Sequence, residues 1–144
     1  MGTSLSHWQL DSRLQADTIR VVEDDFRIIL LMNDCRWPWL IQVPKIADAE
    51  ELHDLDGERV LQELERTTML ANQLKSITQC EKINIASIGN IVRQLHIHII
   101  ARNPGDANWP GPVWGHGQAL PYPASQSAEL VKQLKDRIIA PSLP

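Results

Sequence analysis

The sequence lacks most of the features that would assign it to a specialised class of protein. Its only cysteines are Cys35 and Cys80, too few for a disulfide framework in 144 residues. It has no block of lysine or arginine and a net charge of -4, which argues against a broad surface for nucleic acid. Its longest apolar run, 28–32, is far too short to cross a bilayer.

The start of the chain does not look like a secretion signal, because 1–10 has no basic segment followed by an apolar stretch. With both cysteines expected to be reduced thiols, this predicts a cytoplasmic protein without a membrane segment. The composition, 43% hydrophobic and 22% charged, is that of an ordinary globular domain. We therefore expect a single domain over 1–144, with a core over about 18–109 and a proline-rich arm and terminal helix over 110–144.

Aromatic residues are scarce apart from tryptophan: the chain has one Tyr, one Phe and five Trp. Four of the tryptophans lie close to prolines: Trp37, Trp39, Trp109 and Trp114. The segment 103–123 holds five of the nine prolines and four of the seven glycines, so we expect an ordered loop there. Most of the tryptophans are therefore expected in or beside turns and loops.

Short strands alternate with helices along the chain. Strands are expected where β-branched and aliphatic runs end at polar pairs or turns: 19–22, 26–32, 40–43, 82–87 and 91–101. Apolar residues at helical spacing predict a short helix at 10–17 and a terminal helix at 127–139. Because the strands come mostly as hairpins, the pattern predicts an α+β fold around an antiparallel sheet.

The longest predicted helix follows Asp56, a suitable N-cap. Its stripe of residues recurs every three or four positions: Val60, Leu64, Thr67, Ala71, Leu74 and Ile77. Glu63 lies off this stripe and is expected to face away from the core. The helix should cover one face of the sheet.

The segment 94–100, Gln-Leu-His-Ile-His-Ile-Ile, carries the strongest chemical signal. In a strand, alternate side chains share a face, so Gln94, His96 and His98 would form a row with members roughly 7 Å apart. Burying imidazoles without partners costs free energy, so this face is expected to border a pocket or a polar surface.

Three interpretations of this row are open from the residues alone. The first is an exposed sheet face with two ordinary histidines. The second is a metal site, which needs a third ligand from a distance, such as Asp106, His116 or His53. The third is nucleophilic attack by one imidazole on an activated phosphate, with the other imidazole and backbone amides holding the charge.

The same segment resembles the histidine triad (HIT) family of nucleotide hydrolases and transferases, whose pattern is His-φ-His-φ-His-φ-φ with φ apolar. Gln94 stands in place of the first His. The segment 40–45, Leu-Ile-Gln-Val-Pro-Lys, resembles a family strand, and 33–39, Asn-Asp-Cys-Arg-Trp-Pro-Trp, is similar to a bacterial branch of the family. The resemblance implies a HIT-like fold, with about five antiparallel strands, one long helix packed on the sheet and a C-terminal helical arm.

The resemblance also implies a nucleoside-phosphate hydrolase or nucleotidyl transferase. His96 would attack the α-phosphorus and form a nucleotidyl-histidine intermediate, His98 would donate hydrogen bonds to the phosphate or leaving group, and Gln94 would support the site. The implied substrate is a phosphoramidate, phosphoanhydride or phosphate ester, expected to derive from a purine mononucleotide. No cofactor or metal is required, although magnesium can accompany a polyphosphate, and a homodimer is expected.

In this family, polar residues around the triad bind the nucleotide. Asn33 or Asp34 matches the position that binds ribose hydroxyls, and the other nucleotide-binding residues implied are Asn84, Gly89, Asn90 and Trp109. This chain departs from the family at Gln94 and at Trp39, which replaces an additional site His and could pack against a base. An alternative function is therefore a nucleotide-binding HIT module with little or no turnover.

Overall fold

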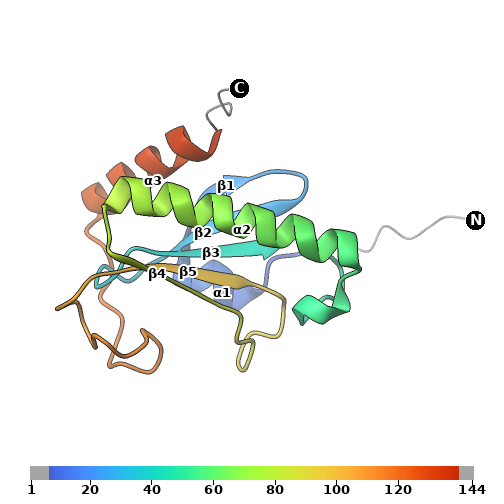
Figure 1. Ribbon diagram of the computed structural model, residues 1–144, viewed down its shortest axis with the longest axis horizontal. Helices are drawn as coiled ribbons and strands as arrows, with labels where there is room; N and C mark the ends of the chain where they lie inside the picture. The colour runs from blue at the N-terminus through green and yellow to red at the C-terminus, as the bar shows by residue number, and fades with distance from the viewer. Residues whose placement is uncertain (1–6, 140–144) are drawn as a thin grey trace, which may run out of the picture.

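A computed structural model of the protein describes residues 7–139, in which five strands form one antiparallel sheet in the order β1-β2-β3-β5-β4 (Figure 1). The strands are β1 (Thr18–Glu23), β2 (Arg27–Met32), β3 (Trp39–Pro44), β4 (Lys82–Ala86) and β5 (Ile97–Arg102). The helices are α1 (Ser12–Asp17), α2 (Gly57–Thr78) and α3 (Ala124–Ile139), with a short 3-10 helix, η1 (Leu52–Asp54). The predicted α+β fold, with one long helix on an antiparallel sheet, is confirmed.

The long helix α2 begins where the sequence predicts. The Asp56 carboxylate accepts a hydrogen bond from the backbone N–H of Arg59 at 2.8 Å, which satisfies a donor that the first helical turn leaves free. The helix ends at Gln79, whose left-handed backbone (φ 56°) stops the hydrogen-bond ladder. Across residues 7–139, neither α2 nor any other helix is long and apolar enough to cross a membrane.

The buried face of α2 differs from the predicted stripe. Leu64 is 45% exposed, whereas Glu63, expected to face away, is 1% exposed. Glu63 is buried because it has polar partners: Gln42 of β3 donates to its carboxylate at 3.1 Å, and Arg66 pairs with it at 2.7 Å. A carboxylate can lie beneath a helix when hydrogen bonds compensate for its lost hydration, and a periodicity of apolar residues does not report such partners.

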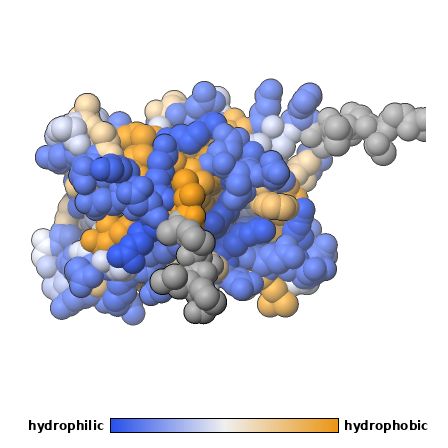
Figure 2. All heavy atoms as spheres, turned by 90° about the horizontal axis from the view of Figure 1, so that it is seen from above, coloured by the Kyte–Doolittle hydropathy of each residue, from blue (hydrophilic) through white to orange (hydrophobic). Residues whose placement is uncertain are grey.

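Both faces of the sheet are buried. Helices α2 and α3 cover one face, over a cluster that includes Leu40, Leu74 and Leu134 (Figure 1). The other face carries the second cluster, which consists of Leu14, Ile28, Leu30, Trp37, Trp39, Ile41, Val43, Ile100 and Val113. Seen from above, the layer of α2 and α3 is mostly hydrophilic, with hydrophobic residues showing in patches (Figure 2). The histidines lie on the face opposite these helices.

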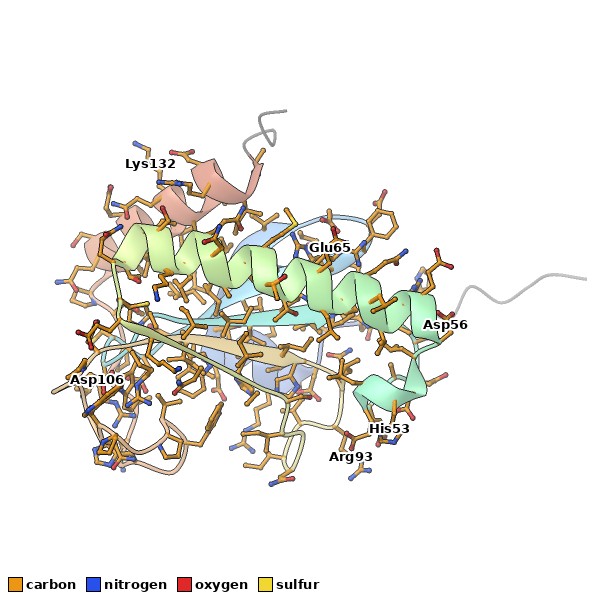
Figure 3. The ribbon with its side chains drawn as sticks, in the orientation of Figure 1. His53, Asp56, Glu65, Arg93, Asp106 and Lys132 are labelled. Carbon is orange, nitrogen blue, oxygen red and sulfur yellow. The ribbon has the colours of Figure 1, made fainter. Side chains whose placement is uncertain are left out.

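The proline-rich segment 103–123 forms turns without helix or strand, as predicted. Its first turn is held by Arg102, which is 1% exposed, pairs with Asp106 at 2.7 Å and donates to the Gly111 carbonyl at 2.9 Å. These hydrogen bonds from Arg102 hold the pKa of Asp106 below its ordinary value. Asp106 lies in the loop below the sheet, on the side away from α2 (Figure 3). The segment is thereby folded back under the histidine-bearing face.

Candidate active site

The strand that carries the histidines is shorter than predicted. The sequence favours a strand over 91–101, but β5 begins at Ile97, and 91–96 is irregular. The pairing of β5 with β3 starts at Ile97, and its pairing with β4 starts at His98, so 91–96 has no partner strand on either side. The predicted row of three side chains is therefore wrong at Gln94, which lies outside the strand.

His96 and His98 do come together. Their ring centroids are 4.8 Å apart at an interplanar angle of 71°, and the residues are 6% and 5% exposed. An exposed face with two ordinary histidines is therefore the wrong interpretation. Two adjacent imidazoles withdrawn from water need defined hydrogen-bond partners, and these partners determine which ring nitrogen carries a proton.

His96 has a partner that selects its tautomer. Its Nδ1 lies 2.7 Å from the backbone carbonyl oxygen of Gln94. A carbonyl oxygen only accepts hydrogen bonds, so Nδ1–H of His96 must donate. In the neutral ring, Nε2 is then unprotonated and keeps its lone pair. His96 therefore has the form that a nucleophilic imidazole requires.

His98 has a partner that selects the opposite tautomer. The indole Nε1–H of Trp39 donates to Nδ1 of His98 at 3.0 Å. An indole only donates, so Nδ1 of His98 must be unprotonated and Nε2–H is left as a donor. Burial, reinforced by the neighbouring His96, lowers the pKa of His98 to about 3. His98 is thus a neutral hydrogen-bond donor beside the nucleophile.

Both histidines line a cavity of about 370 Å³. Its walls come from α1, the ends of β2 and β3, the turn before β5 and the proline-rich loop. The lining residues are Arg13, Leu14, Asp17, Met32, Trp39, Ile41, Ile88, Gly89, Asn90, Ile91, Val92, His96, His98 and Trp114. The cavity is thus mainly apolar, with the two imidazoles and a few polar groups at its edge.

The turn before β5 lines this cavity and contains backbone N–H groups without a protein acceptor. Gly89 has φ +73°, a conformation that glycine adopts without strain. Within the described part of the chain, the N–H groups of 89–92 donate to no protein acceptor. Consecutive unpaired amides in a turn form a concave binding site for anions. The structure therefore brings Gly89 and Asn90, predicted at this site, next to His96.

Asn33 and Asp34 do not line the cavity, although the resemblance implies a ribose contact there. The Asn33 side-chain oxygen accepts from the Tyr122 backbone N–H at 2.9 Å, and Asp34 pairs with Arg36 at 2.8 Å. Burial alone would raise the pKa of Asp34, but hydrogen bonds from Arg36 and from the Leu120 amide outweigh it and hold that pKa below its ordinary value. Both side chains hold the loop ending in 120–122.

Asn84, Trp109 and Gln94 also lie outside the cavity wall. The Asn84 side-chain oxygen accepts from Arg102 at 3.2 Å, and the Trp109 ring lies 5.6 Å from the same guanidinium. The Gln94 side chain hydrogen-bonds to the backbone of the N-terminal segment and to neither histidine. Gln94 therefore supports His96 through its backbone carbonyl oxygen and not through its side chain.

A third ligand for a metal at the histidine pair is missing from the described residues. Among 7–139, no three His, Cys, Asp or Glu side chains gather closely enough to hold an ion. His53, on η1, and Asp106, in the proline-rich loop, lie at opposite ends of the molecule (Figure 3). The geometry therefore does not assemble the ligand set that the metal interpretation needs.

The residues of α1 at the cavity were missed by sequence reasoning. Leu14 is 5% exposed and belongs to the core cluster on the histidine face, while Arg13 and Asp17 are exposed at its edge. The sequence of a six-residue helix does not indicate which cavity the helix will border. Only the packing of the N-terminal segment against the sheet reveals this contribution.

Comparisons with known proteins bear on the family and the fold of this chain. The model of the HIT domain family matches residues 13–105. A histidine triad protein from Sinorhizobium meliloti is 44% identical, covers 91% of this chain and 97% of its own, and has a TM-score of 0.88. One from Bradyrhizobium japonicum is 43% identical, with 91% and 98% covered and a TM-score of 0.87.

A more distant structure shares the fold alone. A diadenosine triphosphate hydrolase from Plasmodium falciparum is 17% identical, covers 90% of this chain and 78% of its own, and has a TM-score of 0.62. The search of curated proteins found no match. The family model and the two bacterial structures together show that this chain belongs to the histidine triad family, whose members are generally nucleotide hydrolases or transferases.

Proposed function

We propose that the protein is a nucleoside-phosphate hydrolase or nucleotidyl transferase that acts at the α-phosphate through His96. The observation that carries this proposal is the pair of opposite tautomers at one cavity. His96 keeps a lone pair on Nε2, and His98 keeps a proton on Nε2. A nucleophile and a hydrogen-bond donor side by side are what displacement at phosphorus requires.

In the proposed first step, Nε2 of His96 attacks the α-phosphorus and forms an N–P bond, while the bond from phosphorus to the leaving group breaks. Nε2–H of His98 and the backbone N–H groups of 89–92 donate hydrogen bonds to the oxygens on which charge develops. Water then attacks the same phosphorus, the N–P bond breaks, and a nucleoside monophosphate leaves. An acceptor other than water would give nucleotidyl transfer.

The cavity suits a purine mononucleotide derivative. Its volume of about 370 Å³ lies in the range of small-ligand pockets, roughly 300–1,000 Å³. Leu14, Met32 and Ile41 offer an apolar wall for a base, and the amides of 89–92 lie where a phosphate would meet His96. Asp17 is the carboxylate at this wall, so we propose that it binds the ribose hydroxyls instead of Asn33 or Asp34.

One observation favours the alternative, a nucleotide-binding module with little turnover. The Gln94 side chain hydrogen-bonds to neither histidine, and Trp39 has no proton to exchange with a substrate, so the reaction relies on two imidazoles alone. Affinity would then be retained while the rate falls. Binding and turnover must therefore be measured separately on the same preparation.

The test is release of AMP from an adenosine phosphoramidate and from a dinucleoside polyphosphate, with AMP affinity measured by calorimetry. We expect AMP from both substrates, and we expect EDTA to leave phosphoramidate hydrolysis unchanged because no step uses a resident metal. EDTA can slow the polyphosphate reaction by removing magnesium from that substrate. Tight AMP binding without turnover would establish the binding module, and loss of phosphoramidate hydrolysis in EDTA would overturn the metal-free mechanism.

We also propose that the protein forms a homodimer through β4. This strand is at the edge of the sheet, where its outer backbone groups have no strand partner within the described residues, and Ile85 is 49% exposed on it. Unprotected edges of this kind pair readily with a second strand. Light scattering is expected to give twice 16.3 kDa for the wild type and the monomer mass for Ile85→Lys. A monomeric wild type would refute the dimer.

A further inference from the structure

The side chain that replaces the first triad histidine binds the N-terminal segment. Oε1 of Gln94 accepts from the backbone N–H of Asp11 at 2.9 Å, and Nε2 of Gln94 donates to the carbonyl oxygen of Gln9 at 2.8 Å. These contacts join residues more than 80 positions apart in the chain. The backbone carbonyl of the same residue accepts from His96. Gln94 therefore contacts both the nucleophile and the N-terminal segment.

A primary amide is well suited to this double contact. The C=O of one residue and the N–H of the second residue after it point to the same side of an extended segment, as in a strand pair. The amide carries its acceptor and its donor together at one end, so it can satisfy both groups as a neighbouring peptide would. The two nitrogens of an imidazole direct their hydrogen bonds away from each other, so the family's usual histidine cannot reproduce this pair of parallel bonds.

The clamped segment leads directly into a wall of the cavity. Asp11 is the N-cap of α1, and its carboxylate accepts from the Arg13 backbone N–H at 2.8 Å. A helix of six residues is not stable by itself, so its position depends on tertiary contacts. It carries Leu14 and Asp17, which line the cavity. The hydrogen bonds of Gln94 therefore fix the start of the element that presents these two residues.

We propose that Gln94 is a positioning residue for nucleotide binding: its side-chain amide holds α1 against the cavity. The inference rests on the proposed function for its kinetic consequence, but the clamp itself is a structural statement that can be tested without turnover. A residue that assists the chemical step would change kcat. A residue that positions a binding wall changes KM and AMP affinity, because the histidines keep their own hydrogen-bond partners.

The test is Gln94→Ala in the full chain. We expect AMP affinity to fall and KM to rise by about tenfold, as for the loss of two neutral hydrogen bonds, while kcat changes by less than about threefold. Hydrogen exchange of the amides of 9–17 should become faster, because α1 loses its clamp. Gln15→Ala is the matched control, since Gln15 is an exposed glutamine on α1 with no such bonds, and it should leave all three readouts unchanged.

Two further variants test the two side-chain hydrogen bonds of Gln94 and the effect of restoring a histidine at this position. Gln94→Glu keeps an acceptor for the Asp11 N–H but places a second acceptor against the Gln9 carbonyl, so it should not restore the wild-type KM. Gln94→His restores the family's residue, and we expect it to loosen α1 as Gln94→Ala does. A fall in kcat at unchanged KM in Gln94→Ala, or unchanged exchange of 9–17, would overturn the inference. If the wild type releases no AMP, the proposed function fails. Hydrogen exchange of 9–17 and AMP affinity would still test whether Gln94 holds α1 in place.

Discussion

Replacement of His96 by alanine is expected to abolish turnover, lowering kcat by about a thousandfold or more, because the other imidazole at the cavity, His98, has no lone pair on Nε2 to form the N–P bond. AMP affinity should change much less, since the amides of 89–92 and the apolar wall remain. The measurement is steady-state AMP release beside calorimetry. His53→Ala is the matched control: this histidine lies on η1, and it does not line the cavity.

The proposed intermediate gives an independent check of the same assignment. An N–P bond survives at high pH, so wild-type protein quenched in alkali during turnover should gain the mass of one nucleotidyl group. His96→Ala should gain none. Equal AMP release by wild type and His96→Ala, or a nucleotidyl group attached to another residue, would show that the nucleophile is wrongly assigned.

Replacement of Trp39 by phenylalanine is expected to make activity sensitive to acid. In the wild type, His98 has a pKa of about 3, so it stays neutral above that pH and contributes no acid limb near neutrality. Phenylalanine removes the indole N–H that occupies Nδ1 and leaves room for water. Both changes favour the protonated ring, so the pKa of His98 should rise toward its ordinary 6.5.

The pH profile of kcat/KM measures this effect. Below the raised pKa, the activity of Trp39→Phe relative to wild type should become dependent on pH, because His98 is then a cation beside the nucleophile in the variant and stays neutral in the wild type. Trp114→Phe is the control, since Trp114 packs against His98 at 5.2 Å without a hydrogen bond to it. It should change KM without adding an acid limb. An unshifted profile in Trp39→Phe would show that the indole does not control the state of His98.

The tryptophans have more specific roles than their proximity to prolines indicated. Trp37 donates to the Ala107 carbonyl at 3.0 Å and thereby anchors the proline-rich loop. Trp39, which the resemblance indicates for packing against a base, donates its indole N–H to His98. Of the two tryptophans in the proline-rich loop, Trp114 lines the cavity. Trp109 packs against the Arg102 guanidinium and does not line the cavity. Substrate contact by tryptophan is therefore expected from Trp39 and Trp114 through their rings.

The pattern of residues predicted most of the local elements and the two histidines from which the proposed nucleophile comes. The strands β2 and β3 are mainly apolar runs, and Asp56 caps α2 because a capping carboxylate needs only the next few residues. The His-x-His segment likewise identified the two imidazoles that meet at the cavity. These features depend on neighbours in the chain, so a pattern of residues can predict them.

The start of β5, the burial of Glu63 and the partners of Gln94 depend on contacts between segments that are distant in the chain. β5 begins at Ile97, where its pairing with β3 begins, and pairing with β4 follows at His98. The Glu63 carboxylate is buried because Gln42 and Arg66 hydrogen-bond to it. The Gln94 amide pairs with a segment more than 80 residues away. The same distant packing brings α1 to the cavity. Hydrogen bonds between remote segments produce no periodic pattern of residues in either segment. This part of the site could therefore not be predicted from the sequence.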